Sequence, residues 1–172
     1  PLAWLASFER KGAVLTVRHG AGVETGVDWF AEAVWNGPFE DKSFDQTDIV
    51  FGSAGKITGE QSLVFVSSAS PLDRLCHLQR GNEILVSNSL VCLIAMTFAE
   101  LDPFYKHYPN DFKSIIQGPE THRQSLKTTA GDIALVYVDN LVWQGGCLER
   151  VHKPLIQRKR YSFASYQLYF FI

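Results

Sequence analysis

Residues Arg80 to Met96, which read RGNEILVSNSLVCLIAM, change character in the middle of the stretch. An alternating segment leads through Ser87-Asn88-Ser89 into seven apolar residues that end at Met96. The short polar side chains can accept hydrogen bonds from the free N–H groups of a first helical turn, so the pattern predicts a strand followed by a helix of about three turns. Both faces of this helix are apolar, so we expect neighbouring structure to cover it on both sides.

Short segments rich in β-branched and aromatic residues surround this stretch, with turn residues between them, and predict a sheet-rich protein. The predicted strands are residues 2–8, 13–17, 48–51, 62–67, 74–78, 83–86, 132–138, 141–143 and 147–151. Glycines in Arg80-Gly81-Asn82 and in Gln144-Gly145-Gly146 supply the positive φ that tight turns need, which predicts two antiparallel hairpins.

Two further helices are predicted, one after Pro109 that ends at Gly118 and one over residues 28–35. The polar residues 118–130 have no clear period and predict a surface loop. We expect one domain over residues 1–152, followed by a connector and aromatic segment over residues 153–172.

The composition argues against several classes of function. The chain has 172 residues, of which 46% are hydrophobic, and its net charge of −2 lacks the basic excess that phosphate binding in nucleic acids requires. The longest apolar run falls far short of the ~20 residues that cross a bilayer, so we expect a cytoplasmic protein without a membrane segment. Cys76, Cys92 and Cys147 show no paired spacing, which predicts small buried side chains, with no disulfide framework, metal site or cofactor.

One serine-containing motif is similar in part to a known nucleophile motif. The sequence FGSAG at residues 51–55 is one glycine short of the Gly-x-Ser-x-Gly elbow, and a strand rather than a helix is expected after it, so we interpret it as a turn.

His77 alternates with Cys76 and Leu78 and is expected to be a surface or hydrogen-bonded strand residue. Asp73 and Arg74 are adjacent on a predicted strand and should face opposite sides.

The order of elements over residues 62–96 is a strand, a Ser-Pro-Leu turn, a short strand, a hairpin, another strand and an apolar helix opened by serine. This order resembles the N-terminal glutamine amidotransferase-type domain of asparagine synthase-like proteins. The resemblance continues through residues 112–118, Thr129-Ala130-Gly131 and residues 132–138 to the connector at residues 152–166. It implies an α+β fold of the N-terminal-nucleophile type, an αββα sandwich of two mostly antiparallel sheets with flanking helices.

The departures from the family decide what activity to expect. The family's glutaminase uses an N-terminal cysteine, whereas this chain begins Pro1-Leu2-Ala3, and the family's Asp-Pro-Leu turn is Ser70-Pro71-Leu72 here. The resemblance therefore implies no catalytic residue and leaves Ser70, Asp73 and Asn88 as candidate binding residues. The family's arginine-glycine and asparagine-glycine elements find only faint counterparts at compressed spacing, and we assign them no role.

The resulting hypothesis is a non-catalytic class II glutamine amidotransferase-like domain that serves as a structural or regulatory partner of an ATP-dependent asparagine synthase-like amide-forming domain. The synthetase half's Ser-Gly-Gly-x-Asp-Ser loop is absent from these residues. One alternative is an active amide hydrolase with Ser53, Ser67 or Ser70 as nucleophile. Another is an interaction module that forms a homo-oligomer through the aromatic residues 166–172.

Overall fold

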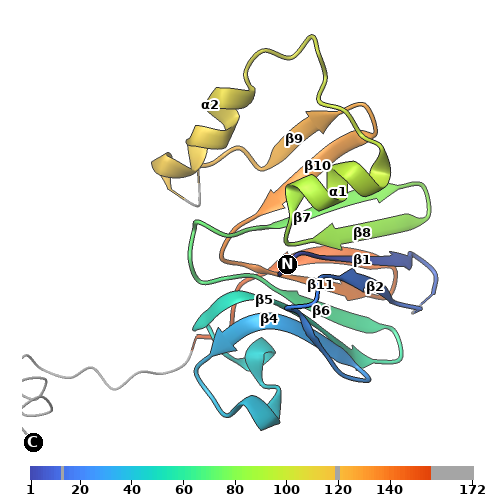
Figure 1. Cartoon of the computed structure of the whole chain (residues 1–172), viewed down its shortest axis with the longest axis vertical. Helices are drawn as coiled ribbons and strands as arrows, with labels where there is room; N and C mark the ends of the chain where they lie inside the picture. The colour runs from blue at the N-terminus through green and yellow to red at the C-terminus, as the bar shows by residue number, and fades with distance from the viewer. Residues whose placement is uncertain (13, 119–120, 156–172) are drawn as a thin grey trace, which may run out of the picture.

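The computed structural model describes residues 1–12, 14–118 and 121–155. Within these ranges the α+β fold consists mainly of a pair of six-stranded antiparallel sheets (Figure 1). The first sheet has the order β2 (Thr16–His19), β1 (Trp4–Glu9), β8 (Glu83–Ser87), β7 (Leu75–Arg80), β10 (Gly131–Val136) and β9 (Ser125–Thr128). The second sheet has the order β12 (Cys147–Val151), β11 (Asn140–Gln144), β6 (Ser62–Val66), β5 (Val50–Gly59), β4 (Trp29–Trp35) and β3 (Glu24–Thr25).

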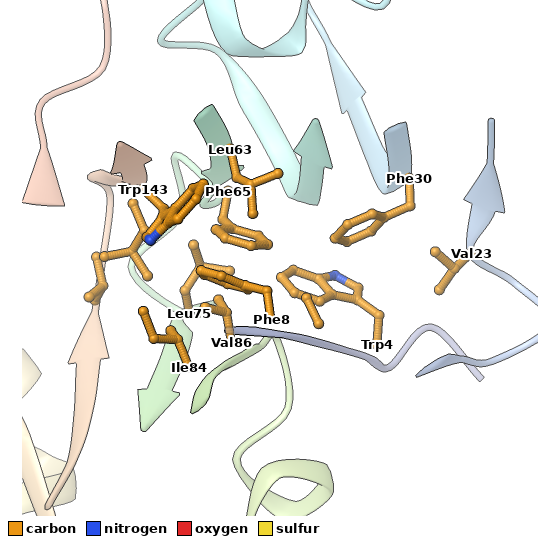
Figure 2. Close-up of a cluster of buried hydrophobic side chains, with 13 residues drawn as sticks. Trp4, Phe8, Val23, Phe30, Leu63, Phe65, Leu75, Ile84, Val86 and Trp143 are labelled. Atoms are coloured by element: carbon orange, nitrogen blue, oxygen red, sulfur yellow. The ribbon is translucent and has the colours of Figure 1, made fainter. Parts of the chain in front are cut away.

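Alternating side chains of the two sheets meet in one aromatic-rich core. In β1, Trp4 and Phe8 point toward the second sheet, where Trp4 meets Phe30 edge-on at a ring-centroid distance of 4.8 Å. Phe8 stacks on Phe65 at 5.8 Å and meets Trp143 edge-on at 5.5 Å. Figure 2 shows these rings interleaved between strands of both sheets. The core thus sits between the sheets, as the alternation of apolar residues along each strand requires.

The outer face of the first sheet is covered by α1 (Leu90–Thr97), α2 (Tyr108–Lys113) and the 3₁₀ helix η3 (Ser114–Gln117). Ser89 caps α1 by accepting a hydrogen bond from the Cys92 N–H at 3.2 Å, so the predicted strand-to-helix change is confirmed. Leu93 is fully buried, but Val91 is 78% exposed. The prediction that both faces of α1 are covered is therefore wrong for the described residues.

The outer face of the second sheet carries a smaller apolar cluster. It is covered by the segment that contains the 3₁₀ helices η1 (Phe39–Asp41) and η2 (Phe44–Gln46). Phe44 of η2 is fully buried against Val50 and Ala54 of β5. In the described residues, α1, α2 and η3 therefore cover one sheet, and the segment with η1 and η2 covers the other.

Three local predictions are wrong. The predicted helix at residues 28–35 is instead strand β4 (Trp29–Trp35), because both of its faces pack against apolar layers and its backbone pairs with β5. The FGSAG motif lies inside β5 rather than in a turn, and residues 118–130 include strand β9. Packing requires a glycine at position 55 of β5, because a Cβ there would lie 2.3 Å from the Phe30 ring.

The predicted hairpins are confirmed, with Gly81 and Gly145 at φ of 61° and 58°. Cys76 is buried as predicted, and burial raises the pKa of its thiol to about 11. Cys147 is exposed, so the prediction of a buried side chain is wrong for this cysteine. Among the described helices, none has the length and apolar character to cross a membrane. The predicted aromatic segment at residues 166–172 lies outside the described residues.

His77 gives a pH-dependent prediction for stability. It lies on the face of β7 that carries Leu75, toward the second sheet and not on the open surface, and burial lowers the pKa of its imidazole below 6.5. Below about pH 6.5, the imidazole of the unfolded chain binds a proton that the folded chain does not. The free energy of unfolding therefore decreases as the pH is lowered from 6.5 toward the pKa of the folded state. Above pH 6.5 this histidine has no effect on stability.

Replacing His77 with glutamine should remove this contribution to the acid dependence. Urea unfolding between pH 5 and 8 measures it, with His107→Gln as the control at an exposed histidine. An unchanged pH dependence in His77→Gln, or an equal change in the control, would contradict the role of His77.

Candidate functional site

A cavity of about 330 Å³ opens where β1 begins, at one end of the two-sheet sandwich, and we call it the β1 cavity. It collects residues from the start of β1, from β4 and β5, from the segment between β6 and β7, and from the end of β8. Its lining residues are Leu2, Ala3, Glu32, Gly52, Ser53, Ser68, Asp73, Arg74, Asn88 and Ser89. Seven of these ten residues are polar, and they carry both signs of charge, which suits a small polar ligand.

Glu32 and Ser53 face each other across β4 and β5 on the side that carries the core. The Ser53 hydroxyl donates to the Glu32 Oε1 at 2.5 Å and accepts a hydrogen bond from the Trp4 Nε1 at 2.8 Å. Ser53 is only 4% exposed. The serine that was interpreted as a turn residue is therefore a buried hydrogen-bonded group in the floor of the cavity.

Asn88 connects the start of β1 to the second sheet. Its Oδ1 accepts from the Trp4 backbone N–H at 2.9 Å, and its Nδ2 donates to the Leu2 carbonyl at 3.0 Å and to the Glu32 Oε1 at 3.1 Å. The predicted binding residue Asn88 thus lies at the cavity, and its amide already makes hydrogen bonds within the protein. Its contribution is to hold Leu2 and Glu32 in place.

Arg74 supplies the positive charge of the cavity. Its guanidinium lies 5.9 Å from the Tyr137 ring and 5.7 Å from the Phe112 ring, and Nη1 donates to the Tyr137 hydroxyl at 3.1 Å. Burial by itself lowers the pKa of Arg74, but the interactions with Tyr137 and Cys76 raise it, and the net direction is upward. The Arg74 Nε is buried and has no hydrogen-bond partner among the described residues.

Asp73 lines the same cavity and is exposed. The prediction that Asp73 and Arg74 are adjacent on a strand is wrong, because both precede β7, so the alternation of a strand does not apply to them. With Glu32 and Asp73 on one hand and Arg74 on the other, the cavity offers partners for an ammonium group and for a carboxylate. This is the charge pattern of a free amino acid.

The other predicted serines lie beside the cavity. Ser70 is not among the lining residues; its Oγ accepts from the Leu72 N–H at 3.2 Å and its carbonyl accepts from the Asp73 N–H at 3.3 Å. Ser70 therefore shapes the turn that presents Asp73. Ser67 is fully buried, and its hydroxyl donates to the Ser68 carbonyl at 3.3 Å.

Sequence reasoning missed Glu32, Gly52 and Arg74 as cavity residues. Glu32 had a signal, since it is an isolated acid within the otherwise apolar run WFAEAVW. That signal was lost because the run was interpreted as a helix. Arg74 and Gly52 gave none, because their proximity depends on how the two sheets stack.

A separate cavity of about 440 Å³ has Ala69, Asp139 and Lys153 among its lining residues. The Lys153 Nζ donates to the Ser67 carbonyl and to the Asn140 Oδ1, the latter at 3.0 Å. Burial lowers the pKa of Lys153 to about 8, while Asp139 and Asp48 oppose this shift. These contacts fasten the start of the predicted connector to the end of β6.

The described residues contain no group of three or more His, Cys, Asp or Glu side chains arranged to hold a metal ion. Comparisons of this chain with family models, curated proteins and solved structures gave no match, so the β1 cavity is assigned from its own geometry.

Proposed function

We propose that this chain is a non-catalytic class II glutamine amidotransferase-like domain with an N-terminal-nucleophile-like fold. Its role is that of a structural or regulatory partner of an ATP-dependent asparagine synthase-like amide-forming domain. In this role the β1 cavity binds an amino acid, such as glutamine, without cleaving it. The resemblance over residues 62–96 and the pair of stacked antiparallel sheets support the proposal.

The observation that carries the proposal is the combination of a charged cavity with an unreactive start of β1. Glu32, Asp73 and Arg74 can pair with the two charged groups of an amino acid. Residues Pro1-Leu2-Ala3, which lead into β1, carry neither a thiol nor a hydroxyl. Leu2 and Ala3, the cavity residues that precede β1, do not supply the nucleophile that the family's reaction needs, so we expect binding without hydrolysis.

The protein should bind L-glutamine and release no glutamate from it. Because the exposed Asp73 carboxylate can pair with the ligand's ammonium group, Asp73→Asn should weaken binding about tenfold, a change of about 1.4 kcal/mol. Isothermal titration calorimetry measures the affinity, and an enzyme-coupled glutamate assay measures turnover.

Asp41→Asn is the matched control, since Asp41 is an exposed carboxylate of η1 outside the cavity lining. Glutamate release well above a protein-free blank would show that the chain is catalytic. Absence of glutamine binding, or equal affinities for Asp73→Asn and the unmodified protein, would reject the assignment of the cavity to amino acids.

The hydrogen bond between Ser53 and Glu32 favours one second candidate, an amide hydrolase in which Glu32 accepts the Ser53 proton during attack. The low exposure of Ser53 and its hydrogen bond from Trp4 oppose this function. A serine-reactive fluorophosphonate probe followed by mass mapping decides between the two. An adduct on Ser53 supports the hydrolase, and an unlabelled Ser53 rejects it.

A further inference from the structure

A second hollow of about 340 Å³ adjoins the β1 cavity. The two share the lining residues Leu2, Glu32 and Gly52. The second hollow is lined in addition by Gly22, Glu24, Ala31, Ala33, Val34, Phe39 and Phe51. Most of these additional residues are apolar, and Glu24 is the one charged residue among them.

The strand register explains why the polar and apolar regions adjoin. Glu32 is paired with Ser53 across β4 and β5, and two residues further along the same strands Val34 is paired with Phe51. Side chains two residues apart on a strand lie on the same face, so the Val34–Phe51 pair continues the surface on which Glu32 and Ser53 lie.

This apolar surface is uncovered among the described residues. Val34 is 68% exposed, Phe51 is 55% exposed, and Leu2 beside them is 58% exposed. Trp4 of the first sheet covers the Ser53 position through its indole hydrogen bond, and Leu2 precedes Trp4 at the rim. An apolar group attached to a ligand in the β1 cavity would therefore find three large apolar side chains directly beyond the charged groups.

We propose that the ligand of this site is an amino acid that carries an apolar substituent, such as an aryl or alkyl amide of glutamate, with its charged groups in the β1 cavity and its substituent on Leu2, Val34 and Phe51. This inference rests on the proposed function for the charged groups and specifies the ligand beyond it. Burial of the substituent removes apolar surface of both partners from water, which strengthens binding relative to glutamine.

The test compares L-glutamine with γ-L-glutamyl anilide by isothermal titration calorimetry on the whole chain. The anilide should bind about tenfold more tightly than glutamine. Phe51→Ala should abolish most of this preference and leave the glutamine affinity unchanged. Phe104→Ala, which removes a phenylalanine that is 90% exposed outside both hollows, should preserve the preference.

Equal affinities of the two ligands, or a preference that survives Phe51→Ala, would overturn the inference. A third outcome would also overturn it: the sedimentation coefficient depends on protein concentration, Phe51→Ala abolishes this dependence, and the anilide binds no more tightly than glutamine. The apolar surface would then join two copies of the chain. The test of this inference is the ratio of the anilide and glutamine affinities. The proposed function is tested separately, by glutamate release and by the effect of Asp73→Asn on glutamine binding.

Discussion

Replacing Trp4 with alanine is expected to lower the free energy of unfolding by about 3–5 kcal/mol. Trp4 is fully buried, and its ring contacts both Phe30 and Phe65 in the core between the sheets (Figure 2). The substitution leaves a cavity in this core. It also removes the hydrogen bond from the indole to Ser53, so that Ser53 loses one of its partners.

Urea unfolding followed by circular dichroism measures this effect. Trp4→Phe keeps an aromatic ring and loses the hydrogen bond, so its expected cost is smaller, about 1–2 kcal/mol. Val27→Ala, at a fully exposed side chain, should change stability by less than about 0.5 kcal/mol. A Trp4→Ala cost near that of Val27→Ala would contradict the central position of Trp4.

The second large effect is expected at Gly52, where alanine should cost more than the roughly 1–3 kcal/mol of an unfavourable backbone conformation. Gly52 has a φ of 95°, which side-chain-bearing residues rarely adopt. A Cβ at this position would lie 2.1 Å from the Glu32 carbonyl oxygen and 2.9 Å from the Ala33 Cα. These are backbone atoms of β4, so relief of the contact would require the strand itself to move.

Gly81→Ala separates the two causes. Gly81 also has a positive φ, of 61°, but a Cβ there would meet nothing within 4 Å. The difference between the two variants in urea unfolding therefore measures the contact with β4. If Gly52→Ala costs no more than Gly81→Ala, β4 and β5 do not approach each other as closely as described. Because Gly52 lines both hollows, Gly52→Ala should also impair glutamine binding.

Most of the strands could be predicted from local pattern. The segments at residues 62–67, 83–86 and 147–151 correspond closely to β6, β8 and β12, because period-two alternation and bounding turn residues act within a few residues. The strand-to-helix change at Ser87-Asn88-Ser89 was predictable for the same reason, since a cap depends on residues next to one another.

The failures have a common physical cause. Residues 28–35 have apolar side chains on both faces, which is compatible with a buried helix and with a strand between two packed layers. Pairing with β5 decides for the strand, and the sequence of this segment alone does not contain that information. Glycines 52 and 55 were interpreted as turn residues because their contacts with Glu32 and Phe30 come from the neighbouring strand.

The residues of the candidate site also divide into those that local sequence indicated and those that only tertiary contacts brought together. The sequence by itself indicated the sheet-rich class, the hairpins and the capped helix, and the family resemblance offered Ser70, Asp73 and Asn88 as candidate binding residues. Only the tertiary structure brought Glu32, Ser53 and Arg74 to the start of β1, and only the register of β4 on β5 placed Val34 and Phe51 beside them. Local patterns record the conformation of short segments, whereas a binding site depends on contacts between residues that lie far apart along the chain.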